Sequence, residues 1–182
     1  MFSFDCYDIR NMTVSKKYLV WTIIVSVLAI AINIFIIVHS CLNASQSSEA
    51  SGGVVLLFKN IINFFKPGAI NDGNIDTFSG FIRKAVGHFG LFMVSGLLSS
   101  LSIYLVFKPM KWSKHYLLVI MGLSFGLLMG IITEVIQLNV EGRSGEFTDV
   151  LIDFSGYLLG ALIIGLILFL ILRKQKHQTP NE

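Results

Sequence analysis

Four long apolar runs divide the chain, and each is long enough to cross a lipid bilayer as a helix. A spanning helix needs roughly 20 mostly apolar residues. The second run is the weakest of the four because it contains His88 and four serines. The runs cover residues 18–38, 85–107, 115–138 and 150–172. The pattern therefore predicts an all-α polytopic membrane protein, built as a compact bundle of about four transmembrane helices.

The connection between the first two runs contains a shorter apolar segment at residues 54–66. Lysine and asparagine side chains recur in it at helical spacing, and Pro67 and Gly68 end it. It is too short to span a bilayer, so we interpret it as a short interfacial amphipathic helix on the outer leaflet. A lid packed on the bundle is the alternative. The small polar residues at 44–53 indicate a linker before it.

Composition supports a surface that faces lipid. Of the 182 residues, 54% are hydrophobic and only 14% are charged, whereas soluble domains carry about a quarter charged residues. The net charge of +3 is small, and no basic patch is interleaved with aromatic residues. We therefore expect membrane lipids as partners and no nucleic acid. The sequence assigns no cofactor.

The placement of lysine and arginine predicts which loops face the cytoplasm, because cytoplasmic loops are enriched in these residues. The N-terminal segment, the short second loop and the C-terminal tail each hold three basic residues. Both termini are therefore expected in the cytoplasm. The predicted organisation is a cytoplasmic segment at 1–17, a first transmembrane helix at 18–38, an outer loop at 39–83, a three-helix core at 84–172 and a cytoplasmic tail at 173–182.

Ionisable side chains from three runs are expected at the outer end of the bundle. At the bilayer centre such a group costs about 2.5–3.5 kcal/mol on insertion scales, so intramembrane ionisable residues are functional candidates by default. Residues three or four apart share a helix face, which groups the polar residues within the third run and within the fourth. The candidate ligand-binding residues are Lys84, His88, Glu134, Gln137, Arg143, Asp149 and Asp153. A purely structural salt-bridge lock of the whole cluster is the alternative, and Arg143 could be a loop charge that pairs with Glu134.

Small residues lead to these polar groups along the same helix faces. Glycines recur every four residues in the third run up to Glu134, and Gly156 and Gly160 follow Asp153 in the fourth. Small residues let transmembrane helices approach closely. We therefore expect close helix packing, with the charged groups facing inward.

Three ordered segments resemble the VanZ-like family. They are a basic residue before His88 and Phe89, the pattern Glu-x-x-Gln at a helix end, and a glycine-arginine loop leading to two acids and a glycine at 142–156. The resemblance runs over about residues 81–166. Family members often carry asparagine at the position of Asp153, and an acid-tyrosine pair where this chain has Gly-Leu-Phe.

The resemblance implies a bacterial, multi-pass protein of the plasma membrane. The family's namesake is linked to resistance to the lipoglycopeptide antibiotic teicoplanin. The resemblance therefore implies a cellular location but no biochemical mechanism, which has to be inferred from the residues themselves.

Three functions fit the residues. In the first, an outward pocket binds a lipid headgroup, a lipid-linked cell-wall precursor or a lipoglycopeptide, with Arg143 and either Lys84 or Arg83 offered to an anion. In the second, the protein is an enzyme acting on a lipid or wall intermediate, with His88 as a general base or as a ligand of magnesium or manganese beside the carboxylates. In the third, it is a small transporter or flippase, which would require an oligomer. No catalytic residue is assigned.

Overall fold

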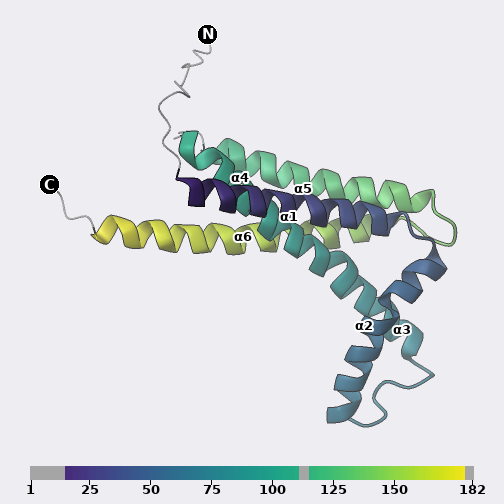
Figure 1. Cartoon of the computed structure of the whole chain (residues 1–182). Coiled ribbons are helices and arrows are strands. Elements are labelled where there is room, and N and C mark those ends of the chain that lie inside the picture. Colours follow the sequence, from purple (N-terminus) through teal and green to yellow (C-terminus); the bar gives the residue numbers. More distant parts are fainter. Residues whose placement is uncertain (1–14, 111–114, 179–182) are drawn as a thin grey trace.

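The computed structural model describes residues 15–110 and 115–178. Within these residues the chain is helical apart from short connections, and no strand is present. Figure 1 shows four long helices forming a bundle, with a helical hairpin projecting from one end. The bundle consists of α1 (Lys16–Ser40), α4 (Leu91–Phe107), α5 (His115–Leu138) and α6 (Phe147–Gln178). The predicted cytoplasmic segment at 1–17 lies almost wholly outside the described residues, as do two lysines of the second loop and the last four residues of the tail.

Among the described residues, four helices are long and apolar enough to cross a membrane. They are Lys16–Ser40, Ile75–Phe107, Tyr116–Leu138 and Phe147–Lys174. Large apolar side chains cover their outer faces, as expected when the solvent is lipid. The predicted all-α class with four spans is confirmed. Each span except the third extends further than its apolar run.

The second span begins ten residues earlier than predicted and is not uniformly α-helical. It runs without a break from α3 (Ile75–Ile82) through the π-helix η2 (Arg83–Gly90) into α4, and a 3-10 turn, η3 (Lys108–Met110), follows. π-Helical segments are rare and are frequent at functional sites. Gly87 and Gly90 flank His88 within η2, and glycine has a low preference for the regular α-helix.

Residues 44–53 are not the linker that their composition indicated. They form the first half of α2 (Ala44–Phe65), which begins with a reciprocal capping box between Asn43 and Gln46. The box satisfies backbone donors at the helix start, which outweighs the low helix preference of the serines and glycines that follow. Figure 1 shows α2 running across the direction of α1 and meeting α3 in a hairpin. Its position on a membrane surface remains a prediction.

Glycines allow α6 to pack directly on the second span. A Cβ atom at Gly156 would collide with the backbone carbonyl oxygen of Phe89, and one at Gly160 would collide with that of Met93. On the opposing helix, Gly96 meets the backbone of α6 just as closely. The predicted close approach is therefore a contact between two helix backbones, the arrangement that small residues permit in membranes.

The bundle core adjoins this contact and is partly polar. Ile36, Phe92, Met129 and the fully buried Tyr157 form its apolar cluster. Between α1 and α4, Asn33 accepts a hydrogen bond from the Ser95 hydroxyl at 2.9 Å and donates to Ser99 at 3.3 Å. Interhelical hydrogen bonds of this kind fix the helices against each other within lipid.

Candidate functional site

A cavity of about 360 Å³ lies at the end of the bundle where α1 ends and α6 begins. Its walls come from α1, α2, α3, η2, the first turn of α4, α5, α6 and the connection at residues 139–146. Six of the seven predicted ligand-binding residues line it: Lys84, His88, Gln137, Arg143, Asp149 and Asp153. The seventh, Glu134, is buried and hydrogen-bonded to Gln137. The fold thus brings together residues from separate stretches of the chain.

His88 and Asp153 join the second span to α6. The His88 Nδ1 atom lies 3.0 Å from Asp153 Oδ1. Thr133 Oγ1 of α5 lies 3.4 Å from Asp153 Oδ2 and 2.9 Å from the Gly130 carbonyl oxygen. Asp153 is completely buried, whereas the His88 side chain is 15% exposed toward the cavity. The close approach at Gly156 brings the helices near enough for this pair to form.

Glu134 and Gln137 form a second cluster at the end of α5. Glu134 accepts hydrogen bonds from Gln137 Nε2 at 3.2 Å and from the backbone N–H of Glu146 at 2.9 Å. Arg143 Nη2 donates to Gln137 Oε1 at 2.7 Å. Within the described part of the chain, no ion pair joins Arg143 to Glu134. The pairing of Arg143 with Glu134 is therefore not formed, whereas His88 and Lys84 do form ion pairs within the cluster.

Two glycines allow the 139–146 connection to fold back on α5. Gly142 has a φ of 72°, a left-handed conformation that glycine adopts without strain. A Cβ atom at Gly145 would lie 2.7 Å from the carbonyl oxygen of Glu134, so only glycine fits there. This close approach places the Glu146 N–H against the Glu134 carboxylate.

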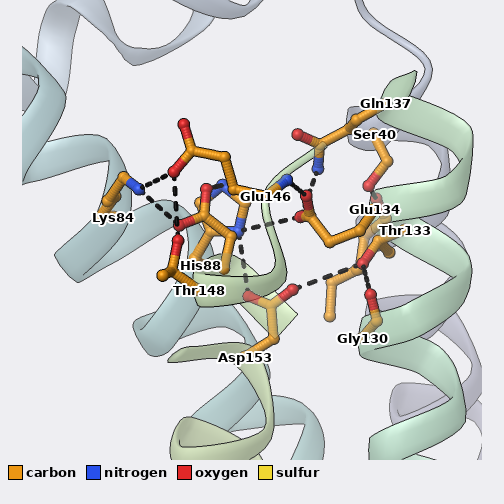
Figure 2. A network of polar contacts seen from close by, with 12 residues as sticks. Ser40, Lys84, His88, Gly130, Thr133, Glu134, Gln137, Glu146, Thr148 and Asp153 are labelled. Atoms are coloured by element: carbon orange, nitrogen blue, oxygen red, sulfur yellow. Dashed lines mark hydrogen bonds and ion pairs between the residues drawn. The ribbon is translucent and has the colours of Figure 1, made fainter. Parts of the chain in front are cut away.

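Lys84 connects η2 to the start of α6 (Figure 2). Its Nζ atom lies 2.6 Å from Asp149 Oδ1 and 2.9 Å from Glu146 Oε2. The hydrogen bond from Lys84 lowers the pKa of the Glu146 carboxyl from its ordinary value of 4.5, and a hydrogen bond from Thr148 lowers it further. Asp149 is buried, so Lys84 supplies the positive charge that this carboxylate requires.

Arg143 retains unused hydrogen-bonding capacity at the cavity wall. Its Nη1 atom is buried and has no hydrogen-bond partner among the described residues. Burial lowers the pKa of the guanidinium, and the nearby Arg83 lowers it further, but an arginine stays protonated in proteins. A buried, unpaired donor is costly, so Nη1 holds hydrogen-bonding capacity that no described residue uses.

One group of side chains has the composition of a metal site. His88, Glu134 and Asp153 each offer a ligand atom, and these atoms lie within 4.8 Å of one another. The imidazole comes from the second span, one carboxylate from α5 and the other from α6. Nitrogen and oxygen ligands of this kind suit divalent cations.

Several cavity residues did not emerge from the sequence. His39 and Ser40 at the end of α1, and Ser47 in α2, line the cavity beside the predicted residues. Thr133 was also missed, although it directly precedes Glu134. A histidine at the end of a long apolar run was the available signal for α1. The alternative of a lid on the bundle concerned residues 54–66, whereas α2 lines the cavity mainly through residues 44–54, which the pattern indicated as a linker.

The chain matches the model of the VanZ/LLP1 family over residues 23–170. The match extends beyond the segment that carries the sequence resemblance and includes most of α1. Comparison with curated proteins returned no significant match, and comparison with solved structures returned none either. The four apolar spans and the matched segment agree on a multi-pass membrane protein. With most of its length covered by the family model, the chain belongs to the VanZ/LLP1 family.

Proposed function

We propose that the cavity binds the anionic headgroup of a membrane lipid or of a lipid-linked cell-wall precursor. The observation that carries the proposal is the buried, unpartnered Nη1 atom of Arg143 at the cavity wall. Guanidinium groups match phosphate and carboxylate through paired hydrogen bonds. Because Nη2 is already held by Gln137, the fork is fixed in position before a ligand arrives.

The charges around the cavity favour Arg143 over the neighbouring lysine as the anchor. Lys84 already contacts two carboxylates, those of Asp149 and Glu146. The guanidinium donates to a neutral amide instead. No carboxylate of the described residues therefore contacts the Arg143 guanidinium directly. An incoming anion does not have to displace one there, as it would at Lys84.

The apolar part of the cavity wall suits a ligand with a lipid tail. Phe35 and Ile36 of α1, Val54 of α2 and Leu91 of α4 line it next to the polar residues. A pocket with an apolar wall and a few placed polar groups is typical of sites for amphiphilic molecules. A lipoglycopeptide carries the same combination of polar head and lipid tail, so it belongs among the ligands to be tested.

We also propose that the protein resides in a bacterial plasma membrane with both termini in the cytoplasm. The lysine and arginine distribution supports this orientation. The cavity then faces the outer leaflet, where lipid-linked wall precursors and lipoglycopeptides are encountered.

Thermal unfolding of the detergent-purified protein tests the anion site. Phosphatidylglycerol, undecaprenyl diphosphate and teicoplanin are added separately, with phosphatidylcholine as the zwitterionic comparison. A ligand at 100 times its Kd stabilises the folded state by about 2.7 kcal/mol. For the ligand that binds, we expect Arg143→Ala to raise the Kd about 10- to 100-fold, since a hydrogen bond to a charged group contributes about 1.5–3 kcal/mol.

The matched control is Arg173→Ala, which removes an exposed guanidinium near the opposite end of α6. We expect this variant to bind like the wild type. Equal binding by the Arg143→Ala variant, or no stabilisation by any of the three anionic ligands, would contradict the proposal. Native mass spectrometry of the wild type then identifies which lipid is retained after extraction.

A further inference from the structure

Three ligand-type atoms from three different helical segments converge beside the cavity. His88 Nδ1 lies 3.0 Å from Asp153 Oδ1 and 3.9 Å from Glu134 Oε1, and all three atoms fit within 4.8 Å. Cis ligands around a divalent ion with bonds of about 2.1 Å are separated by about 3 Å. Small side-chain adjustments therefore bring the three atoms to ligand spacing.

The charge of this group is not balanced by the side chains that contact it. Glu134 is 5% exposed and Asp153 is 0% exposed, yet both are carboxylates within membrane-span helices. The mostly buried imidazole of His88 is the only basic side chain in an ion-pair contact with either of them among the described residues. Buried charges are paired or coordinate metals. Two carboxylates that share one imidazole therefore favour an additional cation.

The surroundings orient each of the three side chains. The Thr133 hydroxyl oxygen lies 3.4 Å from the second oxygen of Asp153 and 2.9 Å from the Gly130 carbonyl oxygen, between which it shares one proton. The Glu146 N–H donates to the second oxygen of Glu134 at 2.9 Å. The other ring nitrogen of His88, Nε2, faces Asp149 Oδ2 at 3.9 Å. A carboxylate behind a histidine that uses its other nitrogen as a ligand is a recurring arrangement in metal sites.

We propose that His88 Nδ1, Glu134 and Asp153 bind a divalent cation of the manganese or magnesium type. Two carboxylates with one imidazole form a mainly oxygen ligand set, which suits these ions better than a set rich in thiolate or imidazole. The remaining coordination positions belong to water or to a ligand in the cavity. Thr133 and Asp149 act as positioning residues, since they orient the ligands without offering the atoms of the group.

This inference goes beyond the anion-binding proposal, because the cation is held without any contribution from Arg143. If both sites are correct, an anion at Arg143 lies near a second positive centre. The ligand class is then narrowed to phosphates and diphosphates, which bind magnesium and manganese together with basic side chains. That narrowing rests on the proposed function, whereas the cation site does not.

Manganese binding to the full-length protein in detergent tests the site, with the loss of the electron paramagnetic resonance signal of free Mn²⁺ as the readout. We expect about one Mn²⁺ per chain in the wild type, competed by Mg²⁺. The variants Glu134→Gln and Asp153→Asn should each raise the Kd at least 10-fold, and Asp149→Asn should raise it about 10-fold. Size-exclusion chromatography establishes that each variant is folded.

The control Asp72→Asn removes an exposed carboxylate in the connection between α2 and α3 and should leave the Kd unchanged. Arg143→Ala should also bind Mn²⁺ normally while losing the anion, which separates the two proposals. Absence of stoichiometric Mn²⁺ binding in the wild type overturns the inference, because His88 then simply forms an ion pair with Asp153. Equal Mn²⁺ binding by the folded Glu134→Gln and Asp153→Asn variants overturns it as well, as does binding of Zn²⁺ without Mn²⁺.

Discussion

The contact between the backbones of α6 and the second span gives the sharpest prediction about stability. Replacing Gly156 with alanine adds one methyl group, and its carbon would overlap the carbonyl oxygen of Phe89. That oxygen belongs to the helix backbone, so it cannot rotate away as a flexible side chain would. The two helices must separate, or the backbone of η2 must shift.

Overpacking of this kind costs typically 1–3 kcal/mol. For a chain of 150–250 residues, 1 kcal/mol corresponds to about 2–4 °C in Tm. Measured against a control that adds the same methyl group without a contact, the Tm of Gly156→Ala should therefore be lower by about 2–12 °C. Because Asp153 lies on the same helix and His88 directly precedes Phe89, the shift should also lengthen the His88–Asp153 contact and weaken Mn²⁺ binding.

Gly165 on the same helix is the matched control. A Cβ atom at Gly165 meets nothing within 4 Å, so alanine is accommodated there without a shift. Replacing an interior helical glycine by alanine gains about 0.5–1 kcal/mol, a gain common to both variants. Differential scanning fluorimetry in one detergent compares them. Equal Tm values for the two variants would refute the argument that direct backbone contact holds α6 on the second span.

Three further predictions concern charge, interhelical hydrogen bonds and topology. Lys84→Met removes the hydrogen bond that lowers the pKa of Glu146. In the wild type this hydrogen bond stabilises the folded state above pH 4.5, and the stabilisation is lost as the pH falls and the carboxyl is protonated. The Tm difference from the wild type should therefore narrow on acidification below that pH, and a constant difference would contradict this. Asn33→Leu removes hydrogen bonds to two serines of α4 and should lower stability by about 0.6–1.7 kcal/mol, measured by thermal unfolding. In the Cys6→Ser variant, the exposed Cys41 at the cavity end should react with a membrane-impermeant maleimide in intact cells, whereas protection until lysis would reverse the proposed orientation.

The sequence determined the membrane-spanning architecture because that information is local. Runs of about 20 apolar residues predict spans through their length alone. His88 lies near the start of the second run, Glu134 near the end of the third and Asp149 just before the fourth. Consecutive spans run in opposite directions, so these three positions fall at the same end of the bundle. The alternation therefore predicts His88, Glu134 and Asp149 at one end of the bundle, where the structure brings both carboxylates within 3.9 Å of the imidazole.

Only the tertiary structure decided which of these groups touch. His88 pairs with Asp153 across 65 positions of sequence, and Arg143 binds Gln137 rather than Glu134, its partner in the structural alternative. Neither choice follows from periodicity, because both depend on how far α6 approaches the second span and on how the 139–146 connection folds back. The π-helical turn around His88 and the cavity wall formed by α2 likewise arise from packing between distant segments. Local propensity carries no information about such contacts.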